Sequence, residues 1–386
     1  MNDFNLISHP WVPVHWQDGR HALVGLDELF RNAAHIADLD VVPHERISLI
    51  RLLVCITQAA LGAPDDPSGW EGFGANLEET VPSYLARADI LPHFNLFGEG
   101  PRFLQRSKLE GTEPELTSWI VFRLATGNNG TQFDHFGGTE RALPPEEIAK
   151  AMLAWQNFSP PVGKHTGDGP CSKNNALHCL IQGKSLSRTI LLNCLDSESI
   201  SANWSGGVGR PVWEVIHSGG SIESATTTYL GRLVPVHRPL WLIDSTWLRK
   251  GRDGVKYPSF AESQIREPSV ALRNLRDGVA IKGMWDTERA IWRDLEAIGA
   301  DRQFAMGTQT QMCPLIIQSH LFELDEEAVL PVWLGAVVFE NTASLVKTVE
   351  STFDLPSEFF TEIGRTVYSK GIAWAETSMS SLKLAS

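Results

Sequence analysis

The 386-residue chain lacks the motifs that mark the commonest catalytic centres. It has no G-x-S-x-G, no H-E-x-x-H, no G-x-x-x-x-G-K-[ST] and no G-x-G-x-x-G opening a helix. These absences argue against a serine hydrolase, a zinc protease, a P-loop NTPase and a dinucleotide-dependent oxidoreductase. Low-complexity runs and internal repeats are also missing, which argues against a disordered chain or a solenoid.

Long apolar runs are scarce as well. The longest, Ile47–Leu61, carries Arg51 and Gln58 and is too short to cross a bilayer, so we expect a buried helix and no membrane partner. Residues 1–19 have neither the basic start nor the apolar core of a secretory leader. Together with an odd number of cysteines, five, this predicts reduced thiols and a cytoplasmic location.

Positive charge is in short supply overall, because the formal net charge is -13. Such a balance argues against diffuse coating of nucleic acid, although a local basic stripe remains compatible with it. Residues 228–293 hold 12 Lys and Arg against 7 Asp and Glu, whereas residues 321–363 hold 9 acids and one lysine, Lys347. The sequence therefore predicts a basic centre and an acidic C-terminal part.

The pattern of elements predicts a mixed α+β protein of two or perhaps three domains. Residues 1–320 mix short strands, loops and helices, with the clearest helix following Pro43. Residues 321–386 are expected to be helical, starting with helices at Ala328–Val338 and Thr342–Thr352. This predicts an N-terminal globular domain and a helical C-terminal region.

The segment Gly163–Arg188 combines glycines with basic residues. It holds four glycines, three lysines and one arginine, with Asp168 as its only acid. Glycine lets backbone N–H groups approach a ligand closely, and lysine supplies a positive charge for phosphate. The segment therefore favours an anion site, with nucleic acid as the leading candidate; the alternative is a mobile surface loop.

Metal or acid–base chemistry is a weaker interpretation of the same region. Four potential zinc ligands lie within 15 residues: His165, Cys171, His178 and Cys179. Their spacing is irregular for a tetrahedral zinc site, so isolated thiols and a loop histidine are the simpler interpretation. The neighbours Asp134 and His135 offer an acid–base pair, but such pairs arise often by chance.

The segment Met306–Cys313 carries no charge and alternates small with amide side chains. It is expected to form a turn between a helix and a strand. An amide on a rigid turn can enter the minor groove of DNA, whereas glutamines in a hairpin are commonly only solvated.

Six segments in this order resemble one known family. They are Trp11–Val14 with Asp18-Gly19, Leu52–Gln58, Ala125–Asn128, the glycine-rich segment, Arg188–Asn193 and Met306–Gln311. Over about residues 4 to 320 the chain is similar to the CasA family, the large subunits of type I-E CRISPR Cascade surveillance complexes. The N-terminal W-x-P-V and L-L-V-C-I-x-Q pieces together are specific, whereas each loop alone is a weak match.

The resemblance implies a DNA-recognition subunit rather than an enzyme, without a cofactor or metal. Its partners would be guide-RNA-containing Cascade subunits, double-stranded target DNA and a helicase-nuclease that docks later. It would read the protospacer-adjacent motif from the minor groove and help to open the duplex. Family members carry a glutamine wedge, a glycine-rich loop and a lysine finger for this work, and a further loop that anchors the RNA handle.

The resemblance assigns these roles to particular residues here. The wedge falls on Gln311, flanked by Thr310 and Met312, with Gln309 as the competitor. The DNA-contacting loop and the phosphate contacts fall on Gly163, Lys164, Gly167, Gly169, Lys173, Arg273, Arg276 and Lys282. The RNA-handle contacts fall on Asn128, Asn129 and Phe133.

The C-terminal end departs from the family pattern, which finishes in a long four-helix bundle. About 65 residues follow Leu321, too few for four full helices, so a reduced or truncated bundle is expected. Two other functions stay open from the residues alone: a metal-dependent nuclease or phosphodiesterase, and a structural adaptor that binds only protein.

Overall fold

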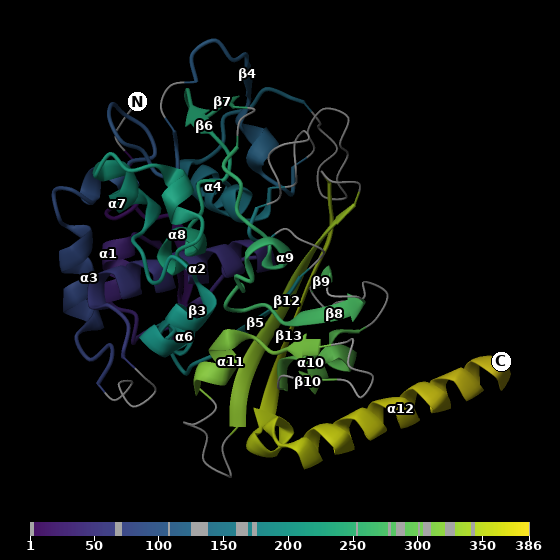
Figure 1. Ribbon diagram of the computed structural model, residues 1–386. Coiled ribbons are helices and arrows are strands. Elements are labelled where there is room, and N and C mark those ends of the chain that lie inside the picture. The colour runs from purple at the N-terminus through teal and green to yellow at the C-terminus, as the bar shows by residue number, and fades with distance from the viewer. Residues whose placement is uncertain are drawn as a thin grey trace.

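The computed structural model shows a mixed α+β fold, as the sequence predicts (Figure 1). The residues that the structure describes are 4–65, 72–106, 109–124, 138–159, 169–171, 176–251, 254–276, 279–282, 290–299, 302–303, 310–320, 329–340 and 344–385. Within these ranges no helix is long and apolar enough to cross a membrane.

The N-terminal part begins with a small antiparallel sheet in the order β2-β1-β3. Its strands are β1 (Val12–Trp16), β2 (His21–Val24) and β3 (Ile36–Leu39). The strands β1 and β2 form a hairpin around Asp18-Gly19, and Gly19 has a φ of +87°, which residues with a side chain rarely adopt. Helix α1 (Leu26–Arg31) follows β2.

Helix α2 (Pro43–Leu61) is the central element of this part. Proline in its first turn, Glu45 near its positive end and Gly62 at its C-cap account for its limits. Most of its residues are buried, since it is surrounded by other helices. The predicted buried helix is therefore confirmed. The helices α3 (Leu77–Leu85), α4 (Pro145–Phe158), α5 (Leu186–Leu192) and α8 (Tyr229–Leu233) pack on it.

Short elements of the first 250 residues include the helices α6 (Ser197–Asn203) and α7 (Val212–His217) and the sheet β4-β7-β6, formed by β4 (Pro114–Leu116), β7 (Trp247–Lys250) and β6 (Leu240–Leu242). This sheet lies at the top of the view in Figure 1.

A second part is built on two sheets. The order β10-β11-β8-β9 joins β8 (Leu272–Arg276), β9 (Val279–Lys282), β10 (Arg302–Gln303) and β11 (Thr310–Met312). The order β13-β12-β5 joins β5 (Leu177–Ile181), β12 (Val329–Glu340) and β13 (Ser344–Pro356). Three short helices lie among them: α9 (Phe260–Ser263), α10 (Glu296–Gly299) and α11 (Leu315–His320).

The helices predicted at Ala328–Val338 and Thr342–Thr352 are wrong, because β12 and β13 form a long antiparallel hairpin there. In β13 the exposed residues Glu350, Thr352 and Asp354 alternate with more buried neighbours, which is the period of a strand. β12 is buried along most of its length because it pairs with both β13 and β5. Among the described residues after 320, helical structure is confined to a short 3-10 turn, Ser357–Phe360, and to α12 (Glu362–Ala385).

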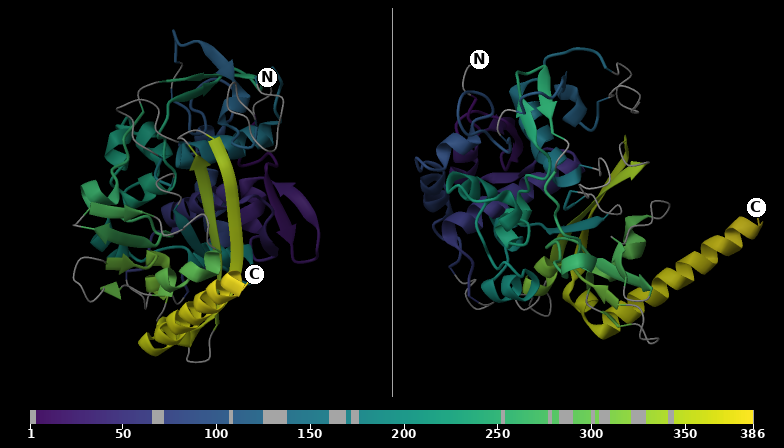
Figure 2. Two further views of the ribbon diagram at one scale, coloured as in Figure 1. Left: turned by 90° about the vertical axis from the view of Figure 1, so that its right-hand side faces the viewer. Right: turned by 45° about the horizontal axis from the view of Figure 1, so that its top comes forward.

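Helix α12 extends away from the rest of the molecule (Figures 1 and 2). It is attached near α10, where Arg365 approaches Gly299 and Tyr368 donates a hydrogen bond to the carbonyl of Trp292. Further along the helix, Glu376 and Met379 contact Arg293. Ile363, Val367 and Trp374 are exposed. A bundle around this helix is not seen among the described residues.

Candidate nucleic-acid interface

The sheet β10-β11-β8-β9 brings together residues that are far apart in the sequence. Gln311 of β11 lies opposite Arg273 of β8, and Arg273 in turn lies opposite Lys282 of β9. On its other side Gln311 lies opposite Arg302 of β10. The structure therefore brings predicted wedge and phosphate-contact positions together at adjacent strand positions. Arg276 lies at the far end of β8, opposite Val279.

One face of this sheet packs on Ala176, in the middle of the glycine-rich segment Gly163–Arg188. Val270 and Leu272 are buried with Ala176, and Met312 packs against this small cluster. The middle of the segment and the strand Thr310–Met312 are therefore neighbours. Met312 thus has a packing role in the sheet.

The first described residues of the glycine-rich segment, 169–171, are attached to the end of α4. The Gly169 N–H donates to the carbonyl of Ser159 at 3.0 Å, and the Cys171 N–H donates to the carbonyl of Asn157 at 3.0 Å. A Cβ atom on Gly169 would lie 2.5 Å from the Asn157 carbonyl oxygen. Glycine is therefore required here for close backbone packing. A contact of Gly169 with DNA remains a prediction.

Several predicted site residues lie outside the described residues: Gly163, Lys164, Gly167, Lys173, Gln309, Asn128, Asn129 and Phe133. For Thr310, Gln311, Arg273, Arg276 and Lys282 the structure describes the strand position alone. What the structure adds for these residues is which strands they occupy and what lies opposite them.

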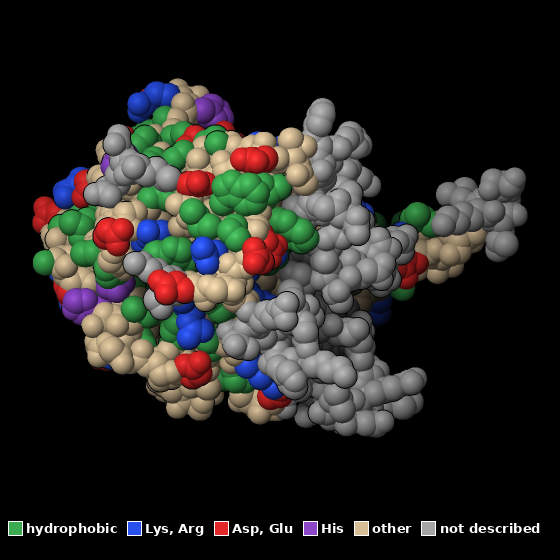
Figure 3. Space-filling view, turned by 90° about the horizontal axis from the view of Figure 1, so that it is seen from above, with side chains coloured by type: hydrophobic (Ala, Val, Ile, Leu, Met, Phe, Trp, Pro, Cys, Tyr) green, Lys and Arg blue, Asp and Glu red, His purple; other side chains and the backbone are tan. Residues whose placement is uncertain are grey.

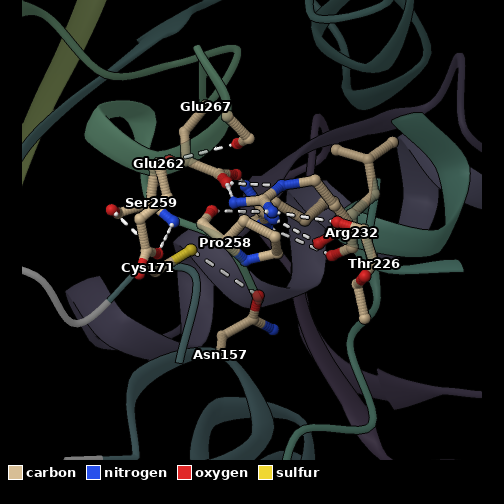
Figure 4. Close-up of polar contacts among 11 residues, drawn as sticks. Asn157, Cys171, Thr226, Arg232, Pro258, Ser259, Glu262 and Glu267 are labelled. Carbon is tan, nitrogen blue, oxygen red and sulfur yellow. Dashed lines mark hydrogen bonds and ion pairs between the residues drawn. The ribbon is translucent and has the colours of Figure 1, made fainter. Parts of the chain in front are cut away.

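The chain segment that leads into β8 is held by a buried ion triad. Glu267 accepts from Arg51 of α2 at 2.9 Å and from Arg232 of α8 at 2.6 Å. Figure 4 shows Glu267 and Arg232 directed toward each other, with Asn157 and Cys171 close by. Burial alone would raise the pKa of Glu267, but the two guanidinium groups outweigh it and lower that pKa.

The two arginines also donate hydrogen bonds to backbone carbonyls. Arg51 donates to the carbonyls of Leu233 and Arg232, and Arg232 donates to those of Thr226 and Pro258. The triad therefore ties α2, α8 and the chain before β8 into one unit. This role was not predicted from the sequence. The signal for it was Arg51, a charged residue inside the apolar run Ile47–Leu61.

Many of the basic side chains in residues 228–293 are buried or form ion pairs within the protein. Arg232, Arg238 and Arg266 are buried, and Arg266 donates to the carbonyl of Cys313. Lys250 pairs with Glu115 at 2.6 Å, and Lys256 pairs with Glu262. On the face shown in Figure 3 acidic and basic side chains are intermixed over the described part. The excess in the sequence is thus not by itself a surface patch.

Of the four residues of the zinc alternative, His165 lies outside the described residues, and the other three do not form a metal-binding group. Cys171, His178 and Cys179 are buried, and His178 Nδ1 lies 3.0 Å from Ser269 Oγ. Burial raises the pKa of Cys171 to about 12 and lowers that of His178 to about 3. In the described ranges no three His, Cys, Asp or Glu side chains are grouped to bind a metal ion.

Comparison with known proteins identifies the family. The model of the family "CRISPR-associated protein Cse1" matches residues 5–386, so the likeness extends beyond the expected residues 4–320. A curated relative, the CRISPR-associated protein CasA/Cse1 of Thermus thermophilus, is 30% identical over 320 residues. These cover 77% of this chain and 60% of the relative, so the chain spans less than two thirds of that relative's length.

Solved structures share the fold. Thermus thermophilus CasA is 22% identical with a TM-score of 0.74, covering 98% of this chain and 78% of that one. Thermobifida fusca Cse1 is 21% identical with a TM-score of 0.75, covering 97% and 78%. A chain of a structure titled "CRISPR RNA-guided surveillance complex" is 17% identical with a TM-score of 0.69, covering 92% and 76%. With the family match over nearly its whole length, the chain belongs to the CRISPR-associated Cse1 (CasA) family.

Proposed function

We propose that this chain is the non-catalytic large subunit of a type I-E CRISPR RNA-guided surveillance complex in the cytoplasm. It would recognise the protospacer-adjacent motif in duplex DNA from the minor groove, promote opening of the duplex and provide the docking surface for the helicase-nuclease. Membership in the Cse1 family supports this, as does the likeness to a chain of a surveillance complex.

The observation that carries the proposal is the sheet β10-β11-β8-β9. Its register sets Gln311 between basic residues of two neighbouring strands, and its packed face adjoins Ala176 in the middle of the glycine-rich segment. Basic residues position a protein on the phosphate backbone, while backbone amides and an amide side chain read the minor groove. The strand positions that the proposal assigns to phosphate contact therefore lie next to Gln311.

The strand positions favour Gln309 over Gln311 as the wedge. Gln311 occupies an inner strand, whereas Gln309 falls in the connection of residues 304–309 between β10 and β11. Pairing on both sides fixes Gln311 within the sheet, so we propose Gln309 as the residue that enters the minor groove, which is about 6 Å wide and admits only a narrow element. Inserting it costs a few kcal/mol of base unstacking and starts the exchange between guide and target.

The loop Gly127–His135 is proposed to hold the RNA handle, with Phe133 stacking on a base and Asn128 and Asn129 donating hydrogen bonds. Aromatic stacking is a common way of holding unpaired RNA bases. The described chain enters this loop at Leu124 and leaves it at Gly138.

The experiment compares Gln309→Ala, Gln311→Ala and the control Gln17→Ala in complexes assembled with guide RNA. Gln17 is an exposed glutamine that donates to the carbonyl of Ala34, next to the sheet β2-β1-β3 and separate from the proposed site. Duplex opening is followed by the fluorescence of 2-aminopurine beside the motif, and loose binding is measured on non-target duplex. Gln309→Ala should slow opening much more than it weakens loose binding.

If opening is lost equally with loose binding, or equally in the Gln17→Ala complex, the wedge role is wrong. If Gln311→Ala alone slows opening, the assignment moves to the strand residue. A wild-type complex that shows no preference for any flanking base pair would contradict motif recognition as a whole.

A further inference from the structure

A single row of residues crosses all four strands of the sheet β10-β11-β8-β9. Arg302, Gln311, Arg273 and Lys282 stand directly opposite one another in that order. The next row contains Met312 and Leu272, which pack against Ala176 and Val270. Because successive residues of a strand alternate between faces, Arg302, Gln311 and Arg273 belong to the face opposite this cluster. Lys282 pairs with Arg273 at the last position before the register of β8 and β9 shifts.

All charged residues in the four strands of this sheet are basic. Its four strands carry four cations, Arg273, Arg276, Lys282 and Arg302, and no acidic residue. Arg273 and Lys282 lie directly opposite each other, and like charges in that position destabilise a sheet. The nearest acids along the chain, Asp277 and Asp301, lie outside the described residues. Such an arrangement is stabilised when an anion binds across it.

We propose that this row is a binding site for the phosphate backbone of one nucleic-acid strand, and that Arg302 is an additional contact residue. The inference rests on the proposed function, which it deepens by specifying how the sheet holds DNA. Arg302, Arg273 and Lys282 bind phosphates without regard to sequence, and Gln311 donates its amide between them.

The dimensions of the row fit a nucleic-acid strand. Neighbouring strands of a sheet lie about 4.8 Å apart, so three intervals place Arg302 roughly 14 Å from Lys282. Phosphates of one strand recur every 3.4 Å or so along the axis of duplex DNA, so the row spans about four of them. Three cations along this distance neutralise up to three charges, which contributes about 2.7 to the salt slope of duplex binding.

The test uses the guide-RNA-loaded complex and measures its affinity for non-target duplex between about 50 and 200 mM salt. Arg302→Gln should reduce the salt slope by about 0.9, and the loss of affinity across this range should become about 3.5-fold smaller. Arg302→Lys should restore the wild-type slope because it keeps the charge. The control is Arg210→Gln, an exposed arginine that bonds to Ser218 beside α7, far from β10 (Figure 1).

An unchanged slope for Arg302→Gln overturns the proposal, as does an equal change in Arg210→Gln. If Arg302→Gln fails to enter the complex, Lys282→Gln on the edge strand β9 makes the same measurement, with the same expected and contradicting results. The two proposals fail separately. A complex without motif preference but with the reduced slope contradicts the proposed function alone, whereas motif preference with an unchanged slope contradicts the phosphate row alone.

Discussion

Replacing Glu267 by glutamine tests whether the buried ion triad holds the two parts of the molecule together. The substitution preserves the size of the side chain but leaves Arg51 and Arg232 without their shared counter-ion. Their side chains are only 4% and 5% exposed, and that of Glu267 is 11% exposed, so water compensates little of the lost interaction. Breaking a buried pair in this way costs about 3–5 kcal/mol of folding free energy.

The effect should also depend on pH. The two arginines lower the pKa of Glu267 below its ordinary value, which is about 4.3 for an unfolded glutamate. The stability that its ionised form contributes is therefore fully present above that value and is lost as the pH falls through the lower pKa of the folded state. The difference between wild type and Glu267→Gln should be constant near neutral pH and shrink only in acid.

Urea unfolding followed by tryptophan fluorescence measures both expectations. The matched control is Glu262→Gln, because Glu262 lies in the same segment but forms an exposed pair with Lys256 (Figure 4). Exposed pairs contribute about 0–1 kcal/mol, so this variant should stay near wild type. A Glu267→Gln variant that loses less than the control, or a difference that grows as the pH falls, would refute the reasoning.

Two other predictions concern packing. Gly169→Ala should lose roughly 1–3 kcal/mol of stability, because its Cβ would meet the Asn157 carbonyl. Gly371→Ala, at a position of α12 with open space around it, should gain about 0.5–1 kcal/mol. Equal unfolding midpoints in urea for the two variants would contradict both expectations. The five buried cysteines should not react with a thiol reagent at mildly alkaline pH until the protein unfolds, and rapid labelling of Cys171 in the native state would contradict its burial and raised pKa.

The elements that could be predicted are those whose signals are local. Pro43 and the acid of the first turn mark the start of α2, and Asp18-Gly19 marks the hairpin of β1 and β2. The hairpin of β12 and β13 was mistaken for helices because β12 is covered on both edges and reads as a continuous apolar run. Such a run does not distinguish a buried strand from a buried helix, and the alternation in β13 was the signal that should have decided it.

The site could be predicted only as a set of residue types. Gln311 and Arg273 are separated by 38 positions in the chain and yet lie opposite each other, because the strand order β10-β11-β8-β9 is not sequential. A register of this kind depends on which strands pair, which a single sequence does not specify. The same reason explains why Arg302, the contact residue that we propose, has no signal in the sequence: nothing in its neighbourhood along the chain distinguishes it from other arginines.

Charge counted along the sequence and charge available to a ligand are different quantities in this protein. Arg232, Arg238 and Arg266 contribute to the basic excess of residues 228–293 but are buried. Arg302 lies outside that segment but joins Arg273 and Lys282 through strand pairing. At a screening length of roughly 8 Å, a phosphate senses the few charges close to it far more than the net -13 of the whole chain. An acidic protein can therefore hold DNA where its fold, rather than its composition, assembles a cationic row.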